Sequence, residues 1–515
     1  MKFDLAILGY GVIGVESLYA LVSEGKKRKL NVAVIEKETK NIPGGVAYSK
    51  ESSKFGFFNN PLRLSHPFFQ KWINKKQNKN KIINFIKKNQ DYHLDEWLEN
   101  NFDNLMKKQV SKEIYFPRLV YSFYLEEKIL ETVKLSKKSK IKIFWFNGEL
   151  DKIKFEDNNL ELKPKSIFES FDLNLRKGNS EIVKKKKYIK FLNTKKIIIG
   201  NGLLPPKKIE FSNKNSSKNY IWDFYSEGGT NNLLKKIRLL KRKRKKILLT
   251  FIGNKAGLLE TTLQMKRLIN IQKVDLYINV ISSKFATLNK AEFSRNFKKF
   301  KLAYFNTKKL NKIKKAKDIL FILKKEFLNA KSKGFNKYDV WTTVLKKNIL
   351  EKSISKLNLK EKQKYNFSIF PKIRNITRFT YSKPISAKES LERNKKINWI
   401  RGKATSIKYD KKNLFIKING KKFIRSDLVI NVSGPVDLKQ LNKETNFIKS
   451  IKERYINKVD KRGFITNKNF MLTKQIFMPG IIAYNFNPSR QTIIKAITNN
   501  SRKVIKFILS TSSIN

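Results

Sequence analysis

Residues 3–36 read FDLAILGYGVIGVESLYALVSEGKKRKLNVAVIE, and this stretch decides the fold. The apolar run Leu5–Leu8 is long enough for a buried parallel strand. Val15–Ser23 then predicts a helix, and Asn31–Ile35 predicts a second strand. The expected order is therefore strand, turn, helix and strand, with both strands buried in a parallel sheet.

Three glycines separate the first strand from the helix with the spacing G-x-G-x-x-G. Gly9 permits a tight turn, Gly11 lets a pyrophosphate approach the backbone, and Gly14 lets the helix pack close to the strand. The helix N-terminus offers unpaired N–H groups and a positive dipole end to phosphates. Glu36 follows the second strand, where a carboxylate can accept hydrogen bonds from ribose hydroxyls. The stretch predicts a dinucleotide site with these candidate contacts: Gly9, Tyr10, Gly11, Val12, Ile13, Gly14, Glu36 and Lys37.

A signal peptide or membrane span is the alternative interpretation of residues 5–22, which are largely apolar. Asp4 stands where a signal peptide needs a basic region, Glu16 interrupts the apolar run, and no small-residue cleavage site follows. A spanning helix needs about 20 predominantly apolar residues, and no other stretch offers them. We therefore expect a soluble, untargeted, cytoplasmic protein without a transmembrane segment.

The composition limits the chemistry that side chains alone can perform. The 515 residues suggest roughly three domains. The absence of cysteine excludes disulfides, thiolate nucleophiles, iron–sulfur clusters and flavin disulfide reductase chemistry. Since only two histidines are present, a histidine-rich metal centre is excluded and we expect no metal. The reaction must therefore depend on a cofactor.

The net charge of +71 raises the possibility of a nucleic-acid or anionic-membrane partner. Arginine, which specific phosphate and base recognition favours, is scarce relative to lysine, and the lysines are spread almost evenly along the chain. The one dense cluster, KRKRKK at 241–246, lies next to a predicted strand and is interpreted as a solvated linker. We expect no specific nucleic-acid partner.

A second glycine turn follows a predicted strand at 247–252. Gly253 begins this turn, but Lys255 stands where the second glycine would be. The next strand, at 274–281, is followed by Ser282, Ser283 and Lys284, and a basic residue there can meet a 2′-phosphate. The alternative is a helix–strand unit that holds no ligand.

Other elements follow from the same patterns. The predicted helices are two short amphipathic ones within 80–101, a longer one from Pro117, and helices at 316–332, 338–358 and about 490–510. The predicted strands lie within 141–193, with an irregular excursion at 165–185, at 196–199, within 397–425 with a hairpin turn at Asn419-Gly420, at 427–435 and at 475–483.

Together these motifs resemble those of the two-dinucleotide-fold flavoproteins. More closely, the chain resembles the FAD/NAD(P)-binding family that includes FAD-dependent urate hydroxylase and the aspartate-oxidising N-monooxygenase, relatives of ornithine and lysine N-hydroxylases and flavin monooxygenases. The resemblance is good over residues 3–125 and loose elsewhere. Besides the first glycine turn and Glu36, the matching segments are Gly45-Val46-Ala47-Tyr48-Ser49, Phe58-Asn59-Asn60-Pro61 with Ser65, Pro117-Arg118, Gly200-Asn201-Gly202 and Ser433-Gly434-Pro435.

The resemblance implies an α/β fold with two dinucleotide-binding, Rossmann-like domains and helical insertions. We expect a discontinuous FAD-binding domain at 1–210 and 426–515, and an NAD(P)-binding-like domain with a helical insertion at 211–425. Lys255 and Asn201, which replaces the usual threonine, depart from the family pattern.

The resemblance also implies roles for individual residues. Asn59 is the candidate catalytic residue, as a hydrogen-bond partner of the flavin edge or of a flavin-bound oxygen adduct; alternatively, Asn59 and Asn60 only terminate a strand. Arg118 is expected to clamp a phosphate or carboxylate, or else to be an ordinary surface arginine. His66 is interpreted as a loop residue and His93 as a surface helix residue. The other candidate cofactor contacts are Asn60, Ser65, Gly202, Gly253, Lys284, Gly434 and Gly480.

The leading hypothesis is an NAD(P)H-dependent FAD monooxygenase that hydroxylates a small polar molecule. We further expect NADPH to reduce the flavin, with Lys284 favouring it over NADH. A flavin dehydrogenase or oxidase is one alternative. Another is a module that binds FAD without an active nicotinamide site, which Lys255 favours. The sequence leaves the substrate and the oligomeric state open.

Overall fold

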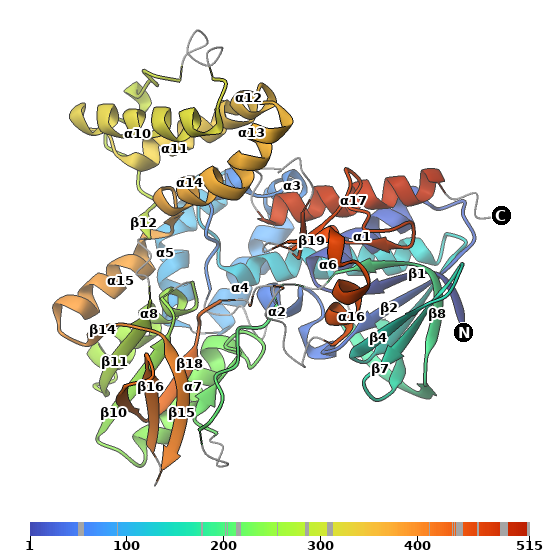
Figure 1. Ribbon diagram of the computed structural model, residues 1–515, viewed down its shortest axis with the longest axis horizontal. Helices are drawn as coiled ribbons and strands as arrows, with labels where there is room; N and C mark the ends of the chain where they lie inside the picture. The colour runs from blue at the N-terminus through green and yellow to red at the C-terminus, as the bar shows by residue number, and fades with distance from the viewer. Residues whose placement is uncertain are drawn as a thin grey trace.

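The computed structural model describes residues 1–49, 56–89, 91–176, 179–200, 202, 204–212, 218–254, 256–283, 288–305, 313–410, 413–434, 436, 438, 446–460, 463–480, 482–484 and 493–511. The fold is α/β, as predicted, with one mixed sheet built on a parallel core, one parallel sheet and a helical insertion (Figure 1). Among these residues, no helix is long and apolar enough to cross a membrane.

The first sheet is built on the stretch that opens the chain. Strand β1 (Lys2–Leu8) lies between β2 (Leu30–Glu36) and β8 (Leu192–Ile199), and all three are parallel. Strand β3 (Ile141–Asn147) extends the sheet beyond β2, and β21 (Ile476–Phe477) pairs with the end of β8. The predicted parallel sheet is therefore confirmed, and its strands end at one common edge.

Four antiparallel strands flank this parallel core. Strands β4 (Leu150–Phe155) and β5 (Leu160–Pro164) continue the sheet from β8, and β6 (Phe168–Arg176) and β7 (Asn179–Ile189) continue it from β3. The expected irregular excursion at 165–185 is wrong, because β6 and β7 pair along most of their length. Phe171 and Leu173, two residues apart, are both buried, which is the period of a strand.

Helices cover both faces of the first sheet. Leu5 and Ile7 contribute to the core on one face, while Ala6 and Leu8 contribute to the core on the other. The second of these faces is covered by α16 (Asn446–Arg454). The apolar core on the first face includes residues of α1 (Val12–Glu24), α3 (Pro67–Ile73), α4 (Lys76–Asn89), α5 (Tyr92–Met106), α6 (Arg118–Ser136) and α17 (Ile493–Thr511). The helices predicted at 80–101, from Pro117 and near the C-terminus are confirmed.

The second sheet is also parallel, in the order β14 (Ile397–Arg401), β11 (Asp275–Ser282), β10 (Lys246–Ile252), β18 (Leu428–Asn431), β9 (Tyr220–Ile221). Its helices are α7 (Gly229–Lys241), α8 (Ala256–Asn270) and α15 (Ser382–Arg393). The sequence pattern assigns β18 to the first domain, but the strand pairs with β10. The boundary expected at 425 therefore lies after β18.

A small antiparallel sheet covers the other face of this second sheet. It consists of β15 (Ala404–Asp410), β16 (Asn413–Ile418) and β17 (Lys422–Ser426), and its Ile407 and Ile416 pack with Ile252 and Val429. The hairpin turn predicted at Asn419-Gly420 is confirmed, with φ of 50° and 74° at these two residues.

The helical insertion has a core of its own (Figure 1, top). The chain enters it after β12 (Asn289–Lys290) and leaves it at β13 (Phe379–Thr380), and these two strands pair with each other. The insertion helices are α10 (Ala316–Ser332), α11 (Lys337–Lys346), α12 (Ile349–Ser355), α13 (Leu359–Lys364) and α14 (Phe370–Ile376), with a π-turn at Tyr365–Ile369.

The remaining elements are short. The chain has a helical turn, α2 (Gly45–Tyr48), and a sheet of β19 (Val459–Asp460), β20 (Gly463–Ile465) and β22 (Ala483–Tyr484). Further 3-10 turns lie at Thr39–Asn41, Leu62–Leu64, Phe297–Lys299 and Ile456–Lys458.

Candidate functional site

The first glycine turn lies at the carboxyl edge of the first sheet. Gly9 has φ of 86°, and its N–H donates to the Ile35 carbonyl at the end of β2 (2.8 Å). A Cβ atom on Gly14 would lie 2.3 Å from the Gly9 carbonyl oxygen. The fold itself therefore requires glycine at both positions, the first for its positive φ and the second for the close packing of α1 on β1.

Gly11 is different, because the protein does not require a glycine there. Its φ is −74°, and a Cβ atom would approach the nearest described atom, the Gly44 carbonyl oxygen, to 3.7 Å. Gly11 is the N-cap of α1 without a side-chain cap, and it pairs with Gly44 in an isolated bridge. Gly45, with φ of 61°, completes a cradle of bare backbone. Such a cradle at a helix N-terminus fits a pyrophosphate.

Glu36 points from the end of β2 to the same turn. Its Oε2 accepts from the Tyr10 N–H (2.6 Å) and its Oε1 accepts from the Glu38 N–H (3.0 Å). Burial raises the pKa of Glu36, and these backbone donors oppose that rise. The carboxylate is thus held beside the turn, where ribose hydroxyls are expected. Lys37 instead pairs with Glu149 (2.9 Å).

Three predicted contacts around this turn offer only their backbone. Val12 and Ile13 are buried in the core, and the Tyr10 ring packs edge-on against Trp145 at 4.9 Å between ring centroids. The Tyr10 hydroxyl is buried without a hydrogen-bond partner among the described residues. These three side chains therefore pack in the core beneath the turn and support its backbone.

Two other strand ends meet at the same edge. Gly200 follows β8, and its N–H donates to the Leu8 carbonyl (2.7 Å). Gly202 is exposed, and a Cβ atom added to it would meet no described atom within 4 Å, whereas Gly480 follows β21 and is buried. Asn201 lies outside the described residues. The predicted convergence of glycine-terminated strands at this edge is present for β1, β8 and β21.

The loop that carries Asn59 is held by the segment before α6. Phe58 N–H donates to Phe116 (2.9 Å), and Leu62 N–H donates to Ile114 (2.9 Å). Asn59 and Asn60 are exposed at the tip of the loop, and Asn59 Oδ1 accepts from the Thr380 hydroxyl (3.4 Å) at the exit of the helical insertion. Asn59 therefore lies where the first domain meets the insertion.

Ser65 and His66 at the end of this loop have structural contacts. The buried Ser65 hydroxyl donates to the Leu62 carbonyl (2.6 Å). His66 Nδ1 accepts from the Phe68 N–H (3.2 Å) and so caps α3. Burial, reinforced by Arg502 and other nearby cations, lowers the pKa of His66 to about 3, so its ring is neutral at pH 7. His93, expected at the surface, is buried in α5.

Arg118 is not an ordinary surface arginine. Its guanidinium pairs with the Glu260 carboxylate of α8, and its Nε donates to the Phe57 carbonyl (3.1 Å). Burial lowers the pKa of Arg118, but Glu260 and the neighbouring tyrosines outweigh this effect and leave the pKa raised. The expected clamp on a ligand anion stays a prediction, since the anion held in this structure is a protein side chain.

The second glycine turn repeats the backbone of the first. Gly253 has φ of 100°, and its N–H donates to Ile281 at the end of β11 (2.8 Å). A Cβ atom there would lie 2.5 Å from Ser433 Cα, and one on Gly257 would lie 2.7 Å from Val432 Cγ1. Gly434 follows β18 and so belongs to this second unit. Lys255 and Lys284 lie outside the described residues.

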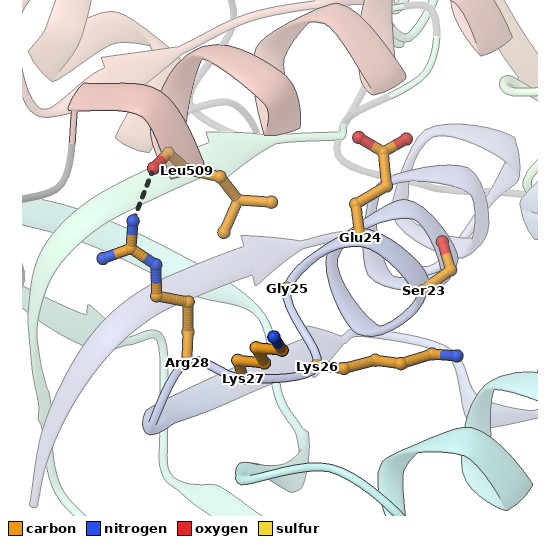
Figure 2. Close-up of a pocket in the computed structure, with 7 residues that line it drawn as sticks. All are labelled: Ser23, Glu24, Gly25, Lys26, Lys27, Arg28 and Leu509. Atoms are coloured by element: carbon orange, nitrogen blue, oxygen red, sulfur yellow. Dashed lines mark hydrogen bonds between the residues drawn. The ribbon is translucent and has the colours of Figure 1, made fainter.

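Figure 2 shows a surface pocket of about 390 Å³ at the opposite end of α1 from Gly11. None of the predicted site residues lines it, and Arg28 donates across it to the Leu509 carbonyl (3.4 Å). The residues that line the pocket are Ser23, Glu24, Gly25, Lys26, Lys27, Arg28 and Leu509.

Within the described residues, no group of three histidine, aspartate or glutamate side chains is placed to hold a metal ion.

Residues 6–166 match the family model described as FAD-NAD(P)-binding. The matched segment contains the glycine cradle, Glu36 and Asn59. A search of curated proteins finds no match.

Two solved enzymes share the fold over nearly the whole chain. The FAD-bound cadaverine monooxygenase DfoA of Erwinia amylovora is 11% identical, with 99% of this chain and 95% of that chain covered and a TM-score of 0.50. The ornithine hydroxylase PvdA of Pseudomonas aeruginosa is 10% identical, with 99% of both chains covered and a TM-score of 0.51. These likenesses show that the chain shares the α/β fold of these two proteins, which agrees with the fold class that the sequence predicts.

Sequence reasoning missed three residues around this site: Glu260, Tyr225 and Thr380. A signal for Glu260 was present, because it follows Gly253 by the same seven positions that separate Glu16 from Gly9. No sequence pattern pairs Thr380 with Asn59 across the insertion. Their contact follows only from the folded arrangement.

Proposed function

We propose that the protein is an FAD-dependent oxidoreductase, specifically an NADPH-dependent monooxygenase that acts on a small polar molecule. The observation that carries the proposal is the bare backbone cradle of Gly11, Gly44 and Gly45 at the open N-terminus of α1. A cradle that the protein does not fill is the arrangement that a dinucleotide pyrophosphate needs.

The chain supplies binding, orientation and exclusion of water. The backbone N–H groups of the α1 N-terminus would hold the pyrophosphate, and Glu36 would accept hydrogen bonds from the ribose. Bound FAD would supply the hydride acceptance and oxygen activation that the side chains lack. Asn59, at the junction with the helical insertion, would contact the reacting edge through its side-chain amide, whose Oδ1 accepts a hydrogen bond from the Thr380 hydroxyl (3.4 Å).

The second unit is proposed to hold NADPH. Its turn at Gly253 has the same conformation as the turn at Gly9, and α8 presents its N-terminus behind it. The structural relatives act on cadaverine and ornithine, which are small polar molecules. As part of the proposal, the enzyme works in the cytoplasm, where NADPH is supplied, and has no specific nucleic-acid partner.

The absorption spectrum of the purified protein tests the proposal. A bound flavin band that is bleached by anaerobic NADPH and restored by oxygen supports it. A flavin band that neither NADPH nor NADH bleaches favours the FAD-binding module instead. Absence of any flavin after reconstitution with FAD contradicts the proposal at its first step.

A further inference from the structure

Arg118 is anchored to the loop that carries Asn59. Its backbone N–H donates to the Gly56 carbonyl (2.8 Å), and its Nε donates to the Phe57 carbonyl (3.1 Å). A Cβ atom on Gly56 would lie 3.2 Å from Arg118 Cδ, so the side chain runs tightly along the loop. Arg118 is therefore attached to this loop through both its backbone and its side chain.

The same side chain reaches the second dinucleotide unit. Its guanidinium pairs with Glu260 on α8, the helix that follows the second glycine turn. The Tyr225 hydroxyl, from the same unit, donates to the Glu260 carboxylate (3.3 Å). The side chains of Arg118 and Glu260 are only 12% and 14% exposed. The pair is thus shielded and held from both domains.

A buried ion pair gains little net stability because both charges lose water, but its hydrogen bonds fix a geometry. We propose that the Arg118–Glu260 pair is a positioning device that sets the second dinucleotide unit against the loop bearing Asn59. It rests on the proposed function, in which one hydride, carrying two electrons, passes from the reduced nicotinamide to the flavin. Since the two nucleotides come from different domains, the pair sets their relative placement and hence the rate of that transfer.

A second ion pair between the same domains provides a matched control. Lys383 of α15 pairs with Glu96 of α5 at 2.8 Å, but their side chains are 32% and 37% exposed. The more exposed a pair is, the more solvent screens it and the less it fixes a geometry. The proposal therefore distinguishes the more shielded Arg118–Glu260 pair from the more exposed Lys383–Glu96 pair.

The first experiment compares Glu260→Gln and Arg118→Lys with Lys383→Ala in anaerobic rapid mixing with NADPH. We expect Glu260→Gln to keep its flavin and its apparent affinity for NADPH but to slow flavin reduction by about tenfold or more. Arg118→Lys retains a cation, so it should slow flavin reduction less than Glu260→Gln does. Lys383→Ala should reduce its flavin at the wild-type rate. An unchanged rate in Glu260→Gln, or an equal loss in Lys383→Ala, would overturn the proposal.

The second experiment does not depend on NADPH. Since the chain has no cysteine, Lys235→Cys on α7 and Lys503→Cys on α17 provide two unique spin-label positions, both exposed. We expect a narrow distance distribution that broadens or shifts when Glu260→Gln is added and not when Lys383→Ala is added. An unaltered distribution in Glu260→Gln contradicts the positioning role. If NADPH fails to reduce the wild type, the proposed function fails, whereas this distance measurement still decides the role of the pair.

Discussion

Glu16 and Glu260 occupy the same place in the two dinucleotide units. Each lies seven residues after the glycine that begins the turn, and each pairs with a cation from a neighbouring element. Glu16 contacts Lys128 of α6 and Arg502 of α17, both at 3.6 Å, so its partners belong to its own domain. Glu260 pairs across the domain boundary. One position of the repeated unit thus stabilises a domain in the first case and joins two domains in the second.

Glu16→Gln is expected to destabilise the protein. Glu16 is fully buried, and neutralising it leaves two cations near it without their carboxylate. Removing one member of a buried charge cluster costs about 3–5 kcal/mol, which denaturant unfolding will measure. Glu453→Gln removes the exposed Lys449–Glu453 pair and should change the free energy of unfolding by less than about 1 kcal/mol. Similar losses in both variants would contradict the argument.

The glycines of the first turn should separate folding from flavin binding. Gly14→Ala places a Cβ atom 2.3 Å from a backbone oxygen and should lower the melting temperature strongly or prevent folding. Gly11→Ala meets no described atom closer than 3.7 Å, so it should fold. It should nevertheless lose flavin affinity by about tenfold or more, and Gly11→Val more still, because the added atoms enter the pyrophosphate cradle. A folded Gly11→Val protein with full flavin content would refute the site.

Asn59→Ala should alter the bound flavin without unfolding the protein. Asn59 is exposed, and its side chain has a long hydrogen bond with Thr380, so its loss costs little stability. We expect retained flavin, a shifted flavin absorption band and a reoxidation rate that differs from the wild type by about tenfold. A preorganised polar group can contribute about two to three orders of magnitude, and this is the upper limit for the effect. Asn60→Ala, at the neighbouring exposed position, is the control. Identical spectra and rates in Asn59→Ala and wild type would exclude the catalytic role.

His66 should make the protein less stable as the pH falls. Its pKa is lowered to about 3 in the folded protein, first by burial and then by Arg502 and Lys128, whereas an unfolded histidine has a pKa of about 6.5. The unfolded state therefore binds more protons between these values, and stability is lost as the pH falls below about 6.5. Between pH 6 and pH 5 the loss is about 1 kcal/mol.

His66→Asn isolates this effect, since asparagine retains an acceptor for the Phe68 N–H but does not titrate. The difference in unfolding free energy between wild type and variant should shrink by about 1 kcal/mol from pH 6 to pH 5. A difference that stays constant over this interval would mean that His66 is protonated in the folded state as readily as in the unfolded one.

The high positive charge should produce only nonspecific adhesion to nucleic acids. The lysines that carry it are dispersed, so any binding should weaken steeply as salt increases and should not distinguish sequences. Competition binding at about 50 and 200 mM salt provides the measurement. Sequence-selective binding that survives at the higher salt would contradict the expectation.

Local units of the fold could be predicted well because their signals are local. The turn at Gly9, the hairpin at Asn419 and the helix after Pro117 each depend on a few neighbouring residues. The placement of β18 could not be read in the same way. An apolar strand that ends near a glycine fits either parallel sheet. In the structure, Leu428–Asn431 pairs with β10, and Val432 and Ser433 pack against the second turn.

The sequence predicts the parts of the candidate site that belong to one local motif, and it does not predict contacts between side chains from different domains. The cradle at Gly11 and the acid at Glu36 follow from the spacing of one unit. The partner of Arg118 is on a different domain, far away in sequence, and no periodic pattern links them. The part of β7 that lies within 165–185 is not predicted as a strand, because residues 184–187 are all lysine and lack the alternation of apolar residues that indicates one. The pairing of β7 with β6 needs only backbone groups.

The paired strands β12 and β13 bring Asn289 opposite Phe379 and Lys290 opposite Thr380. The helical insertion between them packs around its own apolar residues. Because β12 and β13 pair, the two ends of the insertion lie side by side, and the rest of the fold does not depend on the length of the segment between them. Evolution can then lengthen, shorten or exchange this segment as a module while both nucleotide units keep their geometry. Because Thr380 at the end of the insertion contacts Asn59, each exchange would place different residues beside the loop that carries Asn59.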